Sequence, residues 1–192
     1  MEHYTAQIQY DRRNVMRMAH VVRYAFEKVT PPLLQLSGMA IMGAGFYRMY
    51  VAGDGLPLLI LGILIVTNAD VRGRAMGRKM CKFMDGWWPL MKFSFEEDGI
   101  HSETDRETMV APYSSVIRLI DERAFYYVFT GPNTAFMIDK STLSPKDQDG
   151  FMVMLLQRTG QEWTAAGGFP WTIRGLMLKK KNRELRQKLN EK

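Results

Sequence analysis

Two long stretches without a charged residue dominate the first third of the chain. Residues 29–47 form the first stretch and residues 55–69 form the second. Helices of these lengths would reach about 28 Å and about 22 Å, whereas the hydrocarbon core of a bilayer is about 30 Å thick. The pattern predicts a helical hairpin over residues 29–69 that crosses a membrane, with a short second helix.

The segment between the two stretches is typical of a hairpin tip. Residues 52–55 read Ala-Gly-Asp-Gly, which is turn material. Arg48 and Asp54 flank this tip, where they can offset each other's charge or reach the lipid interface. Ala40 and Ala44 lie one helical turn apart and allow another helix to approach closely, and we expect that helix to be the second one of the hairpin. The alternative is a hairpin buried in the core of a soluble protein.

A strand and two further helices are expected around the hairpin. Residues 4–10 place apolar side chains on one face, which predicts a strand that can join the sheet of the later domain. Residues 11–28 have an apolar stripe at helical spacing, so an amphipathic helix either lies on the lipid surface or packs on the domain. We therefore expect a strand and a helix in residues 1–28, and a basic juxtamembrane helix in residues 70–89.

Residues 90–160 consist of short β-forming runs separated by turn residues. Ser144, as the N-cap before Pro145, predicts the start of a helix, and Gly160 predicts its end. The pattern indicates an α+β membrane protein in which a two-helix transmembrane hairpin accompanies an antiparallel β-sheet domain capped by a C-terminal helix. This is the outline of a pleckstrin-homology-like fold. The expected strands are 91–95, 108–113, 116–121, 125–130 and 134–138, with a further short strand at 100–103, and the expected buried helix residues are Phe151, Met152, Leu155 and Leu156.

Charge is arranged in three blocks along the chain. Residues 1–92 carry 12 basic and 6 acidic residues, residues 93–170 carry 6 basic and 12 acidic, and residues 171–192 carry 8 basic and 2 acidic. Both ends of the hairpin are rich in Lys and Arg, whereas its tip offers only Arg48, and such charge favours the cytoplasmic side. We therefore expect a multi-pass protein of the inner (plasma) membrane with both termini in the cytoplasm. The single cysteine, Cys81, excludes an intrachain disulfide.

The later domain carries a family resemblance. The runs FEEDGI (95–100), YSSVIRLIDE (113–122) and FYYVFTGPNTAFMIDKSTL (125–143), followed by a helix with Phe151, resemble the YcxB-like family. The order of a strand and helix, a membrane hairpin and then this domain is similar too, so the resemblance covers about residues 4–160. It implies a bacterial membrane protein with a pleckstrin-homology-like domain, no catalytic residues and no settled activity.

No pattern typical of a catalytic, cofactor or metal site is found in the sequence. His3, His20 and His101 lack metal-ligand spacing with one another and with Cys81. No serine lies in a nucleophile elbow, and no glycine loop is placed to bind phosphate. We therefore expect no enzyme activity, no cofactor and no metal.

An acidic cluster follows the first strand of the domain. A solvated hairpin explains it better than a calcium loop, because the oxygen-ligand spacing of a known loop is missing. Phosphate binding depends on cations, so an acidic cluster at this place predicts weak or no phosphoinositide binding. The cluster comprises Glu96, Glu97, Asp98, Glu103, Asp105 and Glu107.

Residues 161–192 form a basic tail with a thin apolar line at helical spacing: Leu178, Leu185 and Leu189. Near an anionic leaflet each cation contributes about 1 kcal/mol, so the tail can bind the lipid surface. The alternatives are docking on the acidic domain, a plain solvated helix, and nucleic-acid binding, which is disfavoured. Two tryptophans before the domain are expected to divide between the core and the lipid interface. The candidate membrane-surface residues are Trp87, Trp88, Lys179, Lys180, Lys181 and Arg183.

The favoured interpretation is a membrane-anchored, non-enzymatic interaction or regulatory protein. Its partners would be the lipid bilayer and a protein that binds the acidic domain. The alternative is an accessory subunit of a membrane transporter or membrane enzyme complex, in which Ala40 and Ala44 pack against another protein, and self-association into a homo-oligomer is a related option. A third alternative is a soluble enzyme with a buried hairpin.

Overall fold

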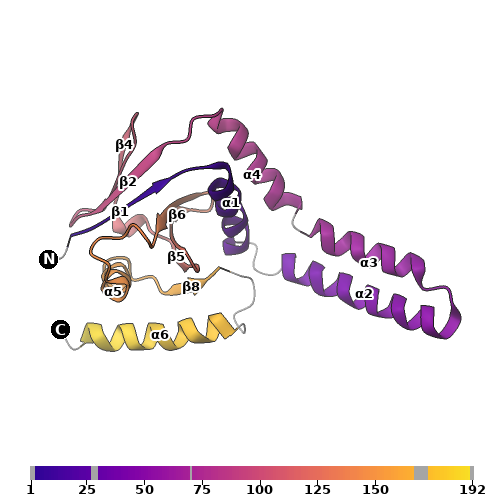
Figure 1. Ribbon diagram of the computed structural model, residues 1–192. Helices are drawn as coiled ribbons and strands as arrows, with labels where there is room; N and C mark the ends of the chain where they lie inside the picture. The colour runs from indigo at the N-terminus through magenta and orange to yellow at the C-terminus, as the bar shows by residue number, and fades with distance from the viewer. Residues whose placement is uncertain (1–2, 27–29, 70, 167–172, 191–192) are drawn as a thin grey trace.

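The computed structural model describes residues 3–26, 30–69, 71–166 and 173–190. Two β-sheets with helices around them form a domain, and a long two-helix hairpin projects from it (Figure 1). The α+β class expected from the sequence is confirmed. The expected end of the first helix at residue 28 and start of the hairpin at residue 29 lie outside the described residues.

The first sheet, here called sheet A, combines strands from both sides of the hairpin. Its order is β1-β2-β3-β4, and every pair is antiparallel. In β1, Tyr4 lies opposite Phe95 and Gln9 lies opposite Leu90, so β1 joins the later domain as its alternation predicts. The hairpin is therefore inserted between two neighbouring strands of one sheet. The strands are β1 (Tyr4–Gln9), β2 (Leu90–Phe95), β3 (Ile100–Glu103) and β4 (Thr108–Ala111).

The second sheet, sheet B, has the order β7-β6-β5-β8. β5 (Arg118–Asp121), β6 (Phe125–Gly131) and β7 (Thr134–Asp139) form an antiparallel meander. β8 (Trp163–Ala165) pairs with β5 in parallel, so the sheet is mixed rather than antiparallel throughout. The strand expected from residue 116 begins at Arg118, because a 3₁₀ turn, η1 (Tyr113–Ser115), precedes it and the Val116 N–H closes on the Tyr113 carbonyl.

The core lies between the two sheets and is held by helix α5 (Gln148–Thr159). The ring of Phe151 contacts Tyr4 and Phe95 from sheet A and Tyr126 from sheet B, with centroid distances of 5.4, 4.9 and 5.3 Å. The contacts with Tyr4 and Phe95 are edge-on and that with Tyr126 is tilted, and aromatic pairs of this kind stabilise a core beyond their buried area. The buried helix residues expected from the sequence, including Phe151, are confirmed.

Helix α5 begins later than the sequence indicates. Asp147, not Ser144, is its N-cap, because the Asp147 carboxylate accepts the Gly150 N–H at 2.9 Å. Ser144 is instead bound by backbone hydrogen bonds to Thr5 of β1. The expected end is correct, since Gly160 closes the helix in the left-handed conformation with φ +67°.

Helices α1 (Arg12–Phe26) and α4 (Val71–Met84) pack on each other at the hairpin side of the domain. α1 buries Val15, Met18 and Ala19, and Arg17 forms an ion pair with Glu122 of the domain at 3.0 Å. Of the two placements that the sequence leaves open for this helix, the structure shows the one packed on the domain.

Helix α6 (Ile173–Asn190) docks along β8 and α5. Leu178 and Leu185 are buried, and the Asn182 side-chain amide donates to the Trp163 carbonyl at 2.8 Å. Lys181 and Lys188 both approach Asp149 of α5, at 3.0 and 3.5 Å. The basic tail thus binds the acidic domain of its own chain, which was one of the sequence alternatives.

Helices α2 (Thr30–Ala52) and α3 (Leu56–Asn68) form the hairpin. Their residue counts of 23 and 13 correspond to lengths of about 35 Å and about 20 Å. Figure 1 shows the hairpin extending away from both sheets, whereas the chain termini lie on the opposite side of the domain. The turn falls within the predicted tip, between Ala52 and Leu56.

Candidate functional site

The hairpin exposes most of its large apolar side chains. Tyr50 is 92% exposed and Tyr47 is 69% exposed. A soluble monomer rarely exposes a continuous apolar surface of this extent, because water contact with apolar area is unfavourable. The hairpin is therefore built to be covered by something outside the described domain. Its exposed large apolar residues are Leu33, Leu34, Leu36, Met39, Phe46, Tyr47, Met49, Tyr50, Val51, Leu56, Ile60, Leu61, Ile63 and Leu64.

Glycines, not alanines, hold the two helices of the hairpin together. A Cβ on Gly62 would lie 2.7 Å from the Gly38 carbonyl oxygen, and a Cβ on Gly45 would lie 2.8 Å from the Leu59 nitrogen. Gly55 meets the Gly45 backbone more closely still. This backbone-to-backbone approach is the packing that small residues permit between membrane helices.

The expected role of Ala40 and Ala44 within the hairpin is wrong. Both residues are exposed on α2, and neighbouring Gly43 has open space where a Cβ would stand. The seam instead uses Gly38 and Gly45, which are seven residues apart and therefore return to the same helix face. The alanines are left on an outer surface of the hairpin.

The predicted charge pairing at the tip is present. Arg48 Nε donates to Asp54 Oδ1 at 3.1 Å, and a second guanidinium nitrogen of Arg48 contacts Asp54 Oδ2. Both side chains are about half exposed. The pair lies at the far end of the hairpin, where a membrane-inserted tip would meet water.

By length and composition, one helical stretch in the described part of the chain can cross a membrane. It runs over Leu56–Met84, through α3 and into α4, with a mean hydropathy of 1.6 in its most apolar window. α2 does not meet the same criterion. A single stretch of this kind also occurs in soluble proteins, so crossing by both helices of the hairpin stays a prediction.

The base of the hairpin carries unpaired cations on α4. Arg74, Arg78, Lys79 and Lys82 are exposed, and the described residues contain no ion pair to any of them. The Arg74 guanidinium donates to the Thr67 carbonyl at the end of α3, at 2.7 Å. A basic surface thus begins where the apolar hairpin ends, as in proteins that bind anionic lipid headgroups.

The structure does not bring the predicted membrane-surface residues together. The Trp87 indole donates to Asp105 at 3.3 Å and lies under the Arg106 guanidinium at 4.3 Å, while Trp88 packs partly against the core. Both tryptophans follow α4, whose 14 residues separate them from α3 by about 21 Å. Trp88 therefore fits the expected core position, whereas Trp87 is engaged by the domain.

The predicted tail residues divide between two faces of α6. Lys181 faces the domain and pairs with Asp149, and these contacts hold the pKa of the Asp149 carboxyl below its ordinary value. Lys179, Lys180 and Arg183 are exposed on the outer face. Only these three stay available for a lipid surface or another partner.

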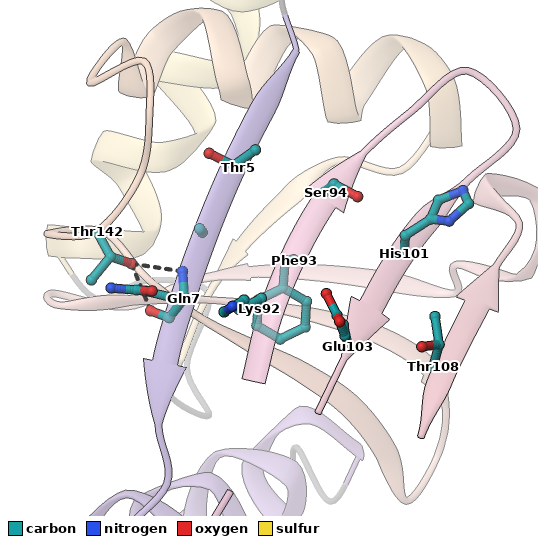
Figure 2. Close-up of a pocket in the computed structure, with 10 residues that line it drawn as sticks. Thr5, Gln7, Lys92, Phe93, Ser94, His101, Glu103, Thr108 and Thr142 are labelled. Carbon is teal, nitrogen blue, oxygen red and sulfur yellow. Dashed lines mark hydrogen bonds between the residues drawn. The ribbon is translucent and has the colours of Figure 1, made fainter. Parts of the chain in front are cut away.

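A depression of about 440 Å³ lies on the outer face of sheet A. Its lining side chains form two rows of cross-strand neighbours (Figure 2). One row consists of Gln7, Lys92, Glu103 and Thr108, and the adjacent row consists of Thr5, Ser94 and His101. Thr142 closes one edge, since its hydroxyl accepts the Gln7 N–H at 3.1 Å and donates to the Gln7 carbonyl at 2.6 Å. Most of its lining side chains are polar, and both charges are present among them.

Ser94, His101 and Asp98 meet beside this depression, yet they are not arranged as a catalytic triad. The Ser94 hydroxyl donates to Glu96 at 3.2 Å, and His101 Nε2 bonds to Asp98 at 2.8 Å. A triad requires the serine hydroxyl to bond to the histidine. Asp98 is the main cause that raises the pKa of His101 above its ordinary value, and His101 in turn lowers the pKa of Asp98.

The same turn contains the one group of possible metal ligands among the described residues. Atoms of Glu96, Asp98 and His101 lie within 4.8 Å of one another. The sequence analysis considered Glu96 and Asp98 for calcium and His101 for zinc separately, so the three were not grouped. The spacing Glu-x-Asp-x-x-His across a tight turn is the signal that joins them. The internal hydrogen bond between His101 and Asp98 accounts for the arrangement without an ion.

Comparison with known proteins identifies one segment of the chain. Residues 95–155 match the family model described as YcxB-like protein, which confirms the resemblance for this segment but not for residues 4–94. The matched segment runs from the end of β2 through most of α5 and includes the Glu96–Asp98–His101 turn. No curated protein and no solved structure matches the chain.

Proposed function

We propose that the chain is a membrane-anchored, non-enzymatic interaction protein. The match of residues 95–155 to the YcxB-like family supports this proposal. The α2–α3 hairpin inserts into the inner membrane, and the two-sheet domain stays at the cytoplasmic surface to bind a protein partner. The domain then serves as a pleckstrin-homology-like module without headgroup-selective phosphoinositide binding.

The exposed apolar hairpin is the observation that carries this proposal. The glycines form the contact between α2 and α3. The large apolar side chains on the other faces of both helices are therefore not covered by the described part of the chain. Lipid removes the unfavourable contact of these side chains with water. A soluble enzyme with a buried hairpin would need the same side chains inside, and their exposure argues against that alternative.

The charge distribution supports the orientation. The exposed cations of α4 follow the hairpin and further Lys and Arg precede α2 in the sequence, whereas the tip carries only the Arg48–Asp54 pair. Lys and Arg accumulate on the cytoplasmic side of short membrane segments. This charge pattern supports a cytoplasmic position for the domain, which is continuous with the base.

The partner surface that we favour is the depression on sheet A. Lys92 and Glu103 line it, and the turns at the two ends of β3, residues 96–99 and 104–107, contain exposed acidic residues. Open strand surfaces with alternating donors and acceptors suit extended polypeptides. The acidic residues at both ends of β3 would attract a basic protein segment to this sheet.

Cysteine labelling of the full chain in cells tests the anchoring and the orientation together. In a Cys81→Ser background, Tyr50→Cys places a thiol near the tip and Lys146→Cys places one on the exposed surface of the domain. We expect a membrane-impermeant maleimide to label the tip thiol in intact spheroplasts and the domain thiol only after lysis. Labelling of the domain thiol in intact spheroplasts, or release of the protein by alkaline carbonate, would refute the proposal.

A second function is favoured by the outward position of Ala40 and Ala44. These small residues leave a flat strip on α2 that another membrane helix can approach closely. The chain would then be an accessory subunit of a transporter or membrane enzyme. Cross-linking in native membranes separates the two: loss of cross-linked partners in Ala40→Leu/Ala44→Leu favours the accessory subunit, and unchanged partners favour the sheet A surface.

A further inference from the structure

Arg118, the first residue of β5, lies among aromatic rings at the hairpin side of sheet B. Its guanidinium is 5.0 Å from the centroid of the Phe26 ring, and it stands opposite Phe129 in the strand register. Phe26 and Phe129 contact each other edge-on, at 5.4 Å. The Phe26 ring contacts the guanidinium without neutralising its charge, because a cation–π contact supplies neither a negative charge nor a hydrogen-bond acceptor.

Arg118 lacks the acceptor that an arginine in this environment requires. Its Nη1 atom is buried without a hydrogen-bond partner, and the described residues provide no ion pair to it. Other half-buried arginines of the domain are satisfied: Arg17 binds Glu122, and Arg158 binds the Glu96 carbonyl. Burial alone lowers the pKa of Arg118, with no charged group contributing. An unpaired, partly desolvated cation is costly and stands out in a native structure.

The position of Arg118 indicates what supplies the missing anion. Phe26 ends α1, and three residues connect it to Thr30 at the start of α2. A connection of that length spans at most about 14 Å, so Arg118 lies close to the base of the hairpin. Arg74 marks the same base on the other helix through its bond to the Thr67 carbonyl. In the proposed orientation this level coincides with the phosphate layer of the bilayer.

We infer that Arg118 binds the phosphate of an anionic phospholipid at the base of the hairpin. The inference rests on the proposed membrane anchoring and adds a specific lipid contact to it. Nη1 is buried and out of reach, whereas Nε and Nη2 of this partly buried side chain are neither buried nor hydrogen-bonded within the described residues, so a phosphate would contact Nε and Nη2. One guanidinium can hold one phosphate in a bidentate contact but cannot distinguish inositol phosphates, so the expected weak phosphoinositide selectivity is retained.

NMR of the arginine side chains tests this contact directly. The full chain, labelled with ¹⁵N-arginine in maltoside micelles, would be titrated with short-chain phosphatidylglycerol, short-chain phosphatidylcholine and inorganic phosphate. The Arg118 Nε–H signal, assigned by its loss in Arg118→Lys, should shift and saturate with phosphatidylglycerol. A response to inorganic phosphate at equal concentration would support the phosphate chemistry and identify a free anion as the source. An unmoved Arg118 signal with every ligand would overturn the inference.

A matched pair of variants completes the test. Arg118→Gln should weaken phosphatidylglycerol binding by about tenfold, the effect of losing one charge-assisted hydrogen bond. Arg123→Gln, an exposed arginine in the turn after β5, should leave binding unchanged. Equal binding by both variants would also overturn the inference. Both should stay in the membrane after a carbonate wash, so a failed phosphate contact is distinguishable from failed anchoring.

Discussion

Gly38 and Gly62 face each other across the α2–α3 hairpin so closely that neither has room for a side chain. A Cβ on Gly38 would lie 3.0 Å from the Gly62 carbonyl oxygen, and a Cβ on Gly62 would lie 2.7 Å from the Gly38 carbonyl oxygen. Each glycine thus packs against the backbone of the other, so the two helices are in direct backbone contact at this point. It joins the middle of α2 to the middle of α3, away from both the tip and the domain.

Gly62→Ala should destabilise the hairpin by about 1–3 kcal/mol, because the added methyl group forces the two backbones apart. Gly43→Ala is the matched control, since open space surrounds that position on the same hairpin. Thermal unfolding of the full chain in maltoside micelles, followed by protease resistance of the hairpin, measures the difference. An equal response of the two variants would contradict the seam.

Leu185→Ala should detach or loosen the docked tail. Leu185 lies on the buried face of α6 and is 1% exposed. Truncation of such a leucine costs about 2–5 kcal/mol. Lys180→Ala, on the outer face of the same helix, should change stability by less than about 0.5 kcal/mol. Urea unfolding of the full chain compares them. Rapid proteolysis of the tail already in the unaltered protein would show that α6 does not dock.

Asp121→Asn should destabilise the domain by about 2 kcal/mol, because it leaves the Lys140 ammonium half-buried without its carboxylate. Burial lowers the pKa of Lys140, and the Asp121 contact opposes that shift. Adding Lys140→Met should recover part of the loss, since the unpaired charge is then removed. A double-mutant cycle in urea measures the coupling, and strictly additive effects would show that the pair contributes none.

The His101–Asp98 pair should make stability depend on pH. The folded pKa of His101 is raised, so its contribution is full below the ordinary value of 6.5 and is lost as the pH rises through the folded pKa. The folded pKa of Asp98 is lowered, so its contribution is full above 3.8 and is lost as the pH falls through the folded pKa. The pair therefore stabilises most between pH 3.8 and 6.5. NMR titration of His101 should give a lower pKa in Asp98→Asn, and an unchanged value would contradict the contact.

Local periodicity was sufficient for much of the fold. The alternation of residues 4–10 places β1 in the sheet, the helical spacing around Phe151 identifies the core face of α5, and Gly160 marks its end. These features depend on neighbours a few residues apart. The Arg48–Asp54 pair was predictable for the same reason, because both residues flank one turn.

Contacts between distant segments were harder to predict. β8 has only three residues and pairs because Trp163 is held by Met152 and Tyr126, not because its own sequence alternates. Ser144 looked like an N-cap, but the backbone of Thr5, far away in sequence, binds it first. The sequence left lipid binding, docking on the domain and a solvated helix open for the tail, because Lys181 looks like any other cation of its run until Asp149 is placed beside it.

The residues that join α2 to α3 were not predicted, because the four-residue spacing of small residues was considered and the seven-residue spacing was not. Ala40 and Ala44 are four residues apart, which suggested one face, whereas Gly38 and Gly45 are seven apart and lie two turns along the other. Both patterns occur in the same helix, and only the position of α3 decides between them. That Arg118 has no ion pair among the described residues could not be predicted either, because a sequence does not show which side chains surround it.

The pairing of β1 with β2 requires the chain between them to begin and end on the same side of any membrane that it enters. The two strands are joined along their full length, from Tyr4 opposite Phe95 to Gln9 opposite Leu90, and everything between them must leave and return on one side. Under the proposed membrane anchoring, an even number of crossings between the strands allows the sheet to close, whereas an odd number would put β1 and β2 on opposite sides of the membrane. A nascent chain that inserts only one helix would therefore lack a complete sheet and be exposed to proteases, so folding itself would check the topology.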